Sequence, residues 1–516
     1  MRQVPVLVVG GSLTGLSAAL FLGAHGVPCL VAERRDGVLA HPRLRGLLPR
    51  AMELYRQAGA ETAILERCPP AAPVSDLVSV HARTLSERHE PLAPTEDEDE
   101  ADPGSGGGAV SPCAFVPIGQ DDLEAVLLDE ACRRGADVRF GTELTGLEQD
   151  PEGVTARLRA PDGTVETVRA AYVIAADGAG SPVRRGLGIG RTGPGALFHM
   201  ATVHLRADLS PALRGRPLGM AYLDSPAPGT TLGPLDSTGL HWFFATSVPP
   251  GDGTDHDPAA WVRAATGLPG LDVEVLEQIP GSGRRISTFP VGAWVADRFR
   301  EGRMFLAGDA AHLMPPTGTF GGLTAVVDAH DLAWKLALVL RGDAGPALLD
   351  TYGAERRPAA ERAMRQAYTR ARRRWRLPGS VPDEPVLPTG VLMYGAAEPS
   401  GAPGTRAPHV YVSDGASSSS AVSTLDLYGA GLVMLVGPEG DAWSEAAAEA
   451  ARRLSVPVEV YHLDEELAAP HGLARGGALL VRPDGVVAWR DDGGDGDGGA
   501  DPGGTVEKVL RGLLCR

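Results

Sequence analysis

The chain of 516 residues is 43% hydrophobic and 22% charged, which is typical of a soluble globular protein and excludes a largely disordered one. Its length exceeds what one hydrophobic core supports, so two or three domains are expected. The formal net charge of −17 at pH 7 argues against nucleic acid or an anionic membrane surface as a partner.

No targeting or membrane segment is expected at the start of the chain. An apolar strand is predicted after the third residue, without the basic region and cleavage site of a secretory signal. No apolar run approaches the roughly 20 residues that span a bilayer. The five cysteines form neither a C-x-x-C pair nor a metal-ligand spacing. We therefore expect a cytoplasmic protein with reduced thiols and no metal site.

The first predicted elements form a β-α-β unit. The run "VPVLVVGG" is apolar up to its two glycines, as expected for a parallel strand that is buried on both faces. Leu13–Ala24 carries apolar residues at helical spacing, and Pro28–Arg35 predicts a second buried strand. Together the three elements have the length of roughly 30 residues that is expected for such a unit.

The turn between this strand and helix has the spacing of a dinucleotide-binding loop, with one change. Gly10 and Gly15 stand at the first and third glycine positions of G-x-G-x-x-G, and Ser12 stands at the second. Amides at a helix N-terminus and the helix dipole favour a pyrophosphate there, and a serine hydroxyl can donate to phosphate. Glu33 stands close to where an acid binds ribose hydroxyls. A glycine-rich turn without a ligand remains the alternative at this point.

Further elements are expected along the middle of the chain. Helices are predicted at Pro49–Ala58, Gln120–Arg134, Leu323–Leu340 and Arg356–Leu377, with Gly342 as a C-terminal stop. Antiparallel strands are expected from Val138 to Arg169 around the turn Pro161–Gly163, and a buried strand ends at Asp177-Gly178. Short β-like runs from Gly190 to Ser287 indicate a separate sheet. The acidic runs Glu96–Asp102 and Asp491–Asp501 are expected to be solvated, mobile loops.

The C-terminal part predicts a small α/β domain. Pro378–Pro408 is rich in Pro and Gly and is expected to be a linker. After it, the runs "GLVMLVG", "VEVYHL" and "GALLVRPDGVVAWR" surround a predicted helix at Trp443–Arg453.

Three sequence blocks carry a resemblance to a known family. They are "VVGGSLTGLSAALFLGAHGV", "AADGAGSPVRRGLGI" and "GDAAH…PPTG…FGG…DAHDLAWKLA". In this order they resemble the FAD-dependent aromatic hydroxylases of the para-hydroxybenzoate hydroxylase type. Shorter matches, among them "HPRLRGLLPRAMELYRQAG", "QDDLE" and "LLDTYGAERRP", extend the resemblance over nearly the whole chain. It is closest to bacterial polyketide-tailoring members with an additional C-terminal thioredoxin-like domain.

The resemblance implies an α/β fold. A Rossmann-like FAD-binding domain is expected to be interleaved with a mixed β-sheet substrate domain, and a thioredoxin-like α/β domain without redox cysteines follows. The expected boundaries are 1–75, 110–189 and 288–377 for the FAD-binding domain, 76–109 and 190–287 for the substrate domain, 378–408 for the linker, and 409–516 for the C-terminal domain.

The resemblance also implies contacts with FAD. Gly10, Gly11, Ser12, Leu13, Thr14 and Gly15 would form the pyrophosphate turn, Glu33 with Arg34 would hold the adenosine ribose, and Leu144 would lie against adenine. Arg43 and Gln120 would contact the ribityl side and the phosphates, and Asp177-Gly178 both FAD and the nicotinamide donor. Asp309 would accept hydrogen bonds from ribityl hydroxyls, and Pro316, Gly321, Gly322, Leu323 and Thr324 would face the flavin's pyrimidine edge. Asp309 as an ordinary helix N-cap is the competing interpretation. No catalytic side chain and no metal ligand is identified.

One block departs from the family pattern. Where the family has "GGNTGIQDA" or "GMNTGIQDA", this chain has "GGLTAVVDA", so that Leu323 replaces an asparagine. Backbone contacts survive this change, whereas a contact from the asparagine side chain is lost. Because of this departure, two alternative interpretations remain. One is a FAD-dependent enzyme of another chemistry, either a non-redox cyclase or a Baeyer–Villiger or epoxidising enzyme, and the other is a protein that has lost the cofactor. A nicotinamide-dependent dehydrogenase would leave the "GDAAH" block unexplained.

The activity that the resemblance implies is that of a flavin-dependent monooxygenase. Such an enzyme would use FAD, NADPH or NADH as electron donor, and O2 to hydroxylate an aromatic polyketide-like substrate of antibiotic biosynthesis. The expected partners are therefore small molecules, with no nucleic acid and no membrane. A monomer or homodimer is expected from the family.

Overall fold

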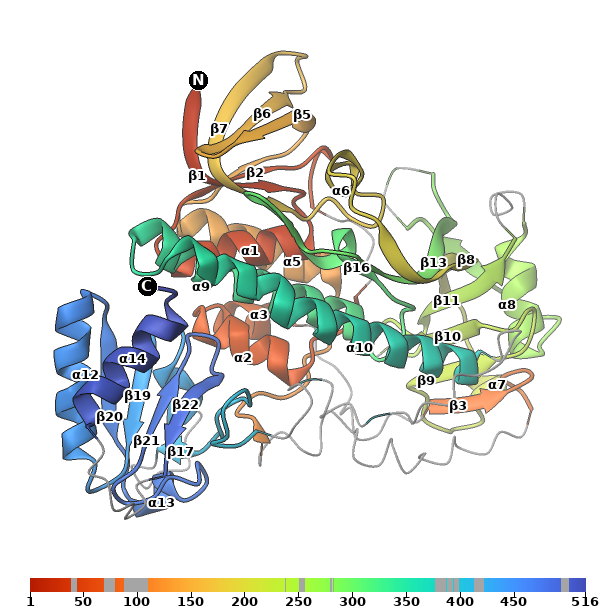
Figure 1. Ribbon diagram of the computed structural model, residues 1–516. Coiled ribbons are helices and arrows are strands. Elements are labelled where there is room, and N and C mark those ends of the chain that lie inside the picture. Colours follow the sequence, from red (N-terminus) through yellow and green to blue (C-terminus); the bar gives the residue numbers. More distant parts are fainter. Residues whose placement is uncertain are drawn as a thin grey trace.

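The computed structural model describes residues 1–38, 44–68, 79–87, 110–236, 238–249, 256–278, 281, 283–375, 387, 393, 399–412, 422–492 and 501–516. This part consists of two large sheets, a smaller four-stranded sheet, a separate two-stranded sheet of β17 (Tyr411–Val412) and β18 (Val422–Ser423), and the helices around them (Figure 1). The acidic run 96–102, most of the run 491–501, most of the expected linker 378–408 and Arg43 lie outside the described residues.

The first large sheet has a parallel centre. Its strands follow the order β14–β15–β7–β1–β2–β4, and β5 and β6 extend it as antiparallel partners of β7. The bounds are Arg2–Val9 (β1), Cys29–Ala32 (β2), Asp137–Arg139 (β4), Glu143–Asp150 (β5), Gly153–Arg159 (β6), Val165–Ala175 (β7), Arg300–Glu301 (β14) and Met304–Leu306 (β15). Val6, Leu7 and Val8 are fully buried, because helices cover the sheet as expected for parallel strands.

Strand β7 differs from the sequence-based expectation. It was expected as two elements, an antiparallel strand up to Arg169 and a separate buried strand before Asp177, and the structure has one continuous strand. One edge pairs in parallel with β1, while the other edge is shared by β6 and β15. The first half alternates between exposed and buried side chains and the second half is buried throughout, so the pattern changes within one strand.

The helices around this sheet include the five predicted ones, two of which begin earlier than predicted, and two short helices, α3 and α6, that were not predicted. The bounds are Leu13–Ala24 (α1), Pro49–Gln57 (α2), Glu61–Arg67 (α3), Gln120–Arg133 (α5), Pro182–Gly186 (α6), Phe320–Arg341 (α9) and Asp350–Arg374 (α10). Gly342 ends α9 with a φ of +79°, which confirms the predicted stop. Helix α10 begins six residues before the expected Arg356 and includes Pro358, a residue that usually marks a helix boundary. Among the described residues, no helix is both long and apolar enough to cross a membrane.

The second large sheet is almost entirely antiparallel. Its order is β16–β13–β8–β11–β10–β9–β3, with β12 paired to β8. The bounds are Ser79–Ala82 (β3), Arg191–Arg206 (β8), Met220–Leu223 (β9), Thr230–Pro234 (β10), His241–Val248 (β11), Glu274–Leu276 (β12), Ser287–Ala296 (β13) and His312–Leu313 (β16), with the helices Ser210–Leu213 (α7) and Pro258–Thr266 (α8). It confirms the separate sheet that was predicted from Gly190 to Ser287.

The C-terminal part forms a third sheet in the order β20–β19–β21–β22. The bounds are Tyr411–Val412 (β17), Val422–Ser423 (β18), Leu432–Val436 (β19), Asp441–Leu454 (α12), Val458–His462 (β20), Glu465–Ala468 (α13), Ala478–Val481 (β21), Val487–Asp491 (β22) and Pro502–Leu513 (α14). This arrangement confirms the predicted strands and the predicted helix near Trp443. Its apolar core includes Trp334 and Leu338 of α9, so this part packs directly on the long helix.

Charged side chains complete the contact between α9 and the C-terminal sheet. Lys335 Nζ is buried and lies 2.8 Å from Asp331 Oδ2 and 3.1 Å from Glu355 Oε2. Arg482, from the turn after β21, lies 2.9 Å and 2.8 Å from the two oxygens of Glu355. The carboxylates of Asp331, Glu355 and Asp484 are close enough together for a cation, but each already forms an ion pair with the lysine or the arginine.

Candidate cofactor site

The glycine-rich turn after β1 requires its first and last glycine. Gly10 has a φ of +105°, and a Cβ there would lie 2.3 Å from the carbonyl oxygen of Ala176. A Cβ on Gly15 would lie 1.8 Å from the carbonyl oxygen of Gly10. Both contacts are with backbone, which cannot move aside as a side chain can. The turn therefore brings the N-terminus of α1 close to the end of β7.

A buried acid closes one side of this turn. Glu33 Oε2 accepts a hydrogen bond of 2.6 Å from the amide of Gly11, and Oε1 accepts bonds from Arg35 N (2.9 Å) and Nε (3.0 Å). Burial by itself raises the pKa of Glu33, but the bonds from Arg35 and Gly11 outweigh it and lower the pKa. The paired arginine is Arg35, whereas Arg34, which the family pattern places beside the ribose, is exposed. The charged carboxylate thus stands at the end of β2.

A second buried acid, Glu124 of α5, contacts the same turn. Its Oε1 accepts hydrogen bonds from Leu13 N (2.9 Å), from Gln120 Nε2 (2.7 Å) and from the hydroxyl of Ser12. The Ser12 hydroxyl also accepts from Gln120 Nε2 (3.2 Å). Ser12 in place of glycine is therefore bound by the neighbouring helix α5. A carboxylate is favoured at a helix N-terminus, and sequence reasoning did not identify Glu124, although it stands one helical turn after Gln120 in "QDDLE".

The Gly308-Asp309 turn packs against the glycine-rich turn. Gly308 has a φ of +60°, and a Cβ there would lie 2.3 Å from Thr14 Oγ1. Its amide donates to Asp328 Oδ2 (3.2 Å). The half-buried Asp309 follows directly. Two segments that are nearly 300 residues apart therefore meet at the N-terminus of α1.

Asp328 of α9 holds this second turn in place and was missed from the sequence. Besides the Gly308 amide, Oδ2 pairs with His312 Nε2 at 2.7 Å and Oδ1 with Arg356 Nε at 2.9 Å. The carboxylate is fully buried. Burial raises its pKa, but His312 and Arg356 outweigh burial and lower it. His312 therefore has a structural role, as a partner of the buried Asp328. In the sequence, only the "DAHD" run of the third family block could have pointed to Asp328.

The first turn of α9 completes the wall opposite Gln120. A Cβ on Gly322 would lie 2.6 Å from the side chain of Leu44, whose amide donates to Gln120 Oε1 (3.2 Å). Leu323 is 5% exposed and belongs to the main apolar core. Thr324 Oγ1 donates to the carbonyl oxygen of Phe320 (2.7 Å). The side chain that replaces the family's asparagine thus packs in the core. Gly321 precedes Gly322 in this turn, and Pro316 is exposed in the segment before it.

The loop after β7 and the start of β5 lie around the same turn. Asp177 Oδ1 accepts from Ser181 Oγ (2.5 Å) and Oδ2 from Val183 N (3.0 Å), and Gly178 has a φ of +80°. Burial raises the pKa of Asp177 above its usual value. Thr142 N donates to the carbonyl oxygen of Glu33 (2.8 Å), and the half-buried Leu144 follows two residues later.

These residues form a cradle that fits a dinucleotide. Leu16 is the first residue of α1 whose amide bonds back along the chain, to the Ser12 carbonyl oxygen at 2.9 Å; the amides before it have no partner within the helix. The close backbone approaches at Gly10 and Gly15 permit the tight turn and the close helix–strand packing that a dinucleotide-binding loop requires. The structure joins the glycine-rich turn to Glu33, Gln120, the loop at Asp177, the Gly308-Asp309 turn and, through Leu44, the start of α9, and Arg43 lies outside the described residues.

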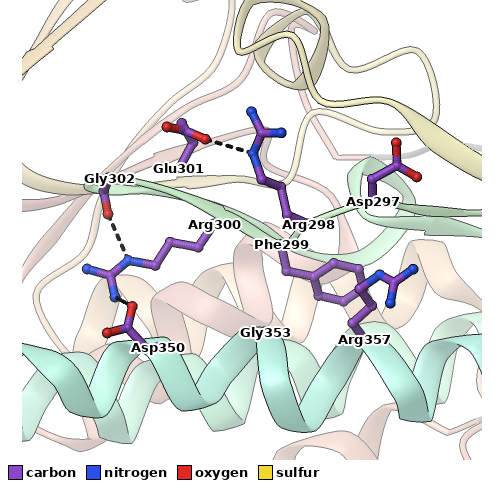
Figure 2. A pocket seen from close by; sticks show the side chains of 9 residues that line it. All are labelled: Asp297, Arg298, Phe299, Arg300, Glu301, Gly302, Asp350, Gly353 and Arg357. Carbon is purple, nitrogen blue, oxygen red and sulfur yellow. Dashed lines mark hydrogen bonds and ion pairs between the residues drawn. The ribbon is translucent and has the colours of Figure 1, made fainter.

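A surface cavity of about 480 Å³ lies away from this cradle. Figure 2 shows it between the end of β13, β14 and α10, with Asp297, Arg298, Phe299, Arg300, Glu301, Gly302, Asp350, Gly353 and Arg357 around it. Arg298 pairs with Glu301 (2.7 Å), and Arg300 with Asp350 (2.5 Å). Two of its arginines are thus already paired with lining acids, and it contains none of the predicted site residues.

An aromatic face of the second sheet is linked to the cradle by Arg45, whose neighbour Leu44 contacts Gln120 and Gly322 and whose guanidinium lies 5.0 Å from the centroid of the Phe243 ring. The cluster on this face joins Met200, Ala245, Val291, Ala371 and Trp375 to the half-buried Leu197, Phe198, Tyr222, Phe243 and Phe289. Cross-strand pairing places His204 opposite Phe243 and His81 opposite Tyr222, so both histidines lie on this face. Sequence reasoning placed the substrate in this region without identifying these side chains, because the register of the strands was unknown.

Comparisons with known proteins agree with this geometry. One family model, described as FAD binding domain, matches residues 3–367, and another, described as aromatic-ring hydroxylase, C-terminal, matches residues 400–514. The tetracenomycin A2 monooxygenase-dioxygenase of Streptomyces glaucescens is 39% identical over 99% of this chain and 97% of its own.

Two solved structures extend the comparison to three dimensions. The ternary complex of aklavinone-11 hydroxylase with FAD and aklavinone superimposes with a TM-score of 0.86 at 36% identity, covering 100% of both chains. The rebeccamycin biosynthetic enzyme RebC with reduced flavin superimposes with a TM-score of 0.81 at 30% identity, covering 99% of both chains.

Proposed function

Since the chain belongs to the family of FAD-binding aromatic-ring hydroxylases, we propose that it uses NADPH or NADH and O2 to hydroxylate an aromatic polyketide-like small molecule. One observation carries the proposal: the glycine-rich turn and the Gly308-Asp309 turn meet at the N-terminus of α1, and the Leu44-Arg45 segment links this cradle to a sheet face lined with aromatic rings. A dinucleotide cradle beside an aromatic face fits a flavin enzyme whose substrate is a flat ring system.

The cradle residues would hold FAD through backbone and side-chain groups. Gly10, Gly11, Ser12, Leu13, Thr14 and Gly15 would contact the pyrophosphate, Glu33 the ribose, Leu144 the adenine and Asp309 the ribityl chain. Arg43, Gln120, Asp177, Gly178, Pro316, Gly321, Gly322, Leu323 and Thr324 complete the proposed set, together with Arg34 beside Glu33. Bound there, FAD supplies the redox chemistry by which O2 is activated. The chain's own residues bind, orient and shield the reactants.

Two features of the chain support that task. The N-terminal end of α9 lies beside Leu44 and Gln120, and its dipole favours negative charge there. The aromatic face offers stacking surface to a polycyclic substrate and excludes water from it. We place the nicotinamide donor near the Asp177-Gly178 loop on the family pattern, and propose the domain boundaries given above and a monomer or homodimer.

A FAD-dependent non-redox cyclase or an enzyme of Baeyer–Villiger or epoxidising type is the alternative on the same scaffold. Its support was the loss of the asparagine at Leu323, and that side chain lies in the apolar core. A buried leucine still permits all contacts that backbone amides of this turn make. The relatives that are named hydroxylases or monooxygenases favour oxygen transfer.

Anaerobic flavin reduction tests the proposal. We expect the purified protein to show flavin absorbance that NADPH bleaches, faster when a hydroxyanthraquinone such as alizarin is present. The reductive step would then be coupled to binding of a polycyclic phenol. Flavin absorbance that NADPH and NADH never bleach, with or without the phenol, would contradict the monooxygenase and favour the cyclase. A Leu323→Asn variant that gained NADPH reduction would then trace the difference to that position.

A further inference from the structure

Arg45 stands between the candidate cofactor site and the aromatic face. Its neighbour Leu44 is held by Gln120 through two hydrogen bonds, from Leu44 N to Oε1 (3.2 Å) and from Gln120 N to the Leu44 carbonyl oxygen (3.1 Å). The side chain of Leu44 also packs against Gly322 at the start of α9. The backbone at Arg45 is therefore fixed within the proposed FAD cradle.

The side chain of Arg45 crosses from this cradle to the second sheet. Nη2 donates to the carbonyl oxygen of Pro234, at the end of β10. Cζ lies 5.0 Å from the centroid of the Phe243 ring, a distance at which the cation and the ring attract each other. Phe243 belongs to the aromatic face, opposite His204. The guanidinium therefore lies on the proposed substrate face.

One nitrogen of this guanidinium has no partner among the described residues. Nη1 is buried from solvent and forms no hydrogen bond, and no carboxylate in the described part of the chain pairs with Arg45. Burial lowers the pKa of Arg45 to about 10, so the group keeps its charge at neutral pH. A buried cation with an unused donor is costly to maintain, and such groups point to a ligand.

We propose that Arg45 binds the ionised hydroxyl oxygen of the aromatic substrate and so selects the phenolate form. The inference rests on the proposed function and names the chemical group by which the substrate is recognised. A guanidinium donates strong, charge-assisted hydrogen bonds to an anionic oxygen. Ionisation places more electron density on the ring carbons that accept oxygen. Arg45 is thus a specificity-determining and positioning residue.

Other titratable groups share this face and enter the interpretation of any pH dependence. On the sheet they are His81, His204, Tyr222, Arg206, His241 and Glu274, by cross-strand register and clustering. From α10, Ala371 and Trp375 pack against the same face, and neither titrates in water. A cation at Arg45 lowers the pKa of a bound phenol, and removal of that cation raises it. A variant of Arg45 alone therefore tests this cation, because the histidines and Tyr222 are not substituted in it.

The ionisation of bound alizarin tests the proposal, because its visible band shifts to longer wavelength when the phenol ionises. We expect the FAD-loaded protein to bind alizarin as the phenolate at pH values where the free dye is neutral. In Arg45→Met the bound dye ionises at higher pH than in the unchanged protein, and affinity falls by about tenfold to a hundredfold. Arg45→Lys, which keeps the charge, recovers part of both. Arg157→Met, an exposed arginine of β6 in the first sheet that pairs with Glu148, changes neither.

Each result decides the question. An unchanged ionisation and affinity in Arg45→Met would overturn the proposal. So would a melting temperature that falls strongly with the ionisation unchanged, since Arg45 would then only clamp Pro234. A large loss of FAD with alizarin binding unaffected would assign the guanidinium to the flavin instead. If the unchanged, FAD-loaded protein bound no alizarin at all, the proposed substrate class would fail, and the inference with it.

Discussion

A Gly15→Val variant is expected to be isolated without FAD, with an affinity for added FAD at least a hundredfold below that of the unchanged protein. The first carbon of the new side chain would lie 1.8 Å from the carbonyl oxygen of Gly10. Because that atom belongs to the backbone of the turn, relief requires the turn itself to open. The amides at the N-terminus of α1 then lose the arrangement that favours a pyrophosphate.

Absorbance of the purified variant and a FAD titration followed by flavin fluorescence measure this effect. Gly15→Ala introduces the same clash with fewer atoms, so it replaces the valine variant in these measurements if that variant fails to fold. Gly186→Ala is the matched control, because a Cβ at that position meets nothing within 4 Å. If Gly15→Val retained stoichiometric FAD at an unchanged melting temperature, the turn would not be the cofactor cradle.

Asp328→Asn is expected to lower the free energy of unfolding by roughly 3–5 kcal/mol, the usual effect of breaking a buried ion pair. The asparagine leaves the guanidinium of Arg356, 2.9 Å away, without its carboxylate. It also weakens the support of the Gly308 amide (3.2 Å). Because the Gly308-Asp309 turn packs against Thr14, FAD binding falls as well.

The same carboxylate makes a pH-dependent contribution. His312 and Arg356 hold the pKa of Asp328 below its usual value, and the unfolded value is about 3.9. Its stabilisation is therefore fully present above about pH 4 and is lost as the pH falls through the lower folded value. Thermal unfolding at several pH values measures both the loss of stability in Asp328→Asn and its dependence on pH. Glu148→Gln, which removes an exposed ion pair with Arg157, is the control. An Asn variant as stable as the unchanged protein would contradict the role given to Asp328.

The parts of the site that follow from local backbone geometry could be predicted from the sequence. Gly10 and Gly15 are spaced for a strand, a tight turn and a helix, and the structure uses both where a Cβ would collide with backbone. Glu33 ends a short buried strand, and its carboxylate reaches the amide of Gly11. In each case the spacing along the chain determines the position, so no knowledge of distant segments is needed.

The polar contacts between distant segments could not be predicted in this way. Ser12 and Glu124 are 112 residues apart, and Arg45 and Pro234 are 189 apart. A sequence shows that these residues are polar or charged, but which of them meet depends on how α5 and the second sheet pack. The pairing of Glu33 with Arg35 and not Arg34 depends likewise on which side chain leaves the strand toward the turn.

Two elements were misjudged for local reasons. Strand β7 changes from alternating to continuous burial within its length, so one strand looked like two. The first turns of helix α10 contain Gly353, a residue that weakens helical patterns, so these turns were missed, although the predicted part already included Pro358. Packing against α9 and β13 compensates for both residues in the folded chain.

Oxygen transfer from O2 is the central claim, and isotope labelling tests it most directly. The FAD-loaded protein would be incubated with NADPH, the polycyclic phenol that most accelerates flavin reduction, and O2 made of the heavy oxygen isotope. Mass spectrometry of the product is predicted to show one added oxygen atom that carries the label. A product with no added oxygen, or with oxygen that came from water, would contradict a monooxygenase and leave the chain with a different use of the same flavin scaffold.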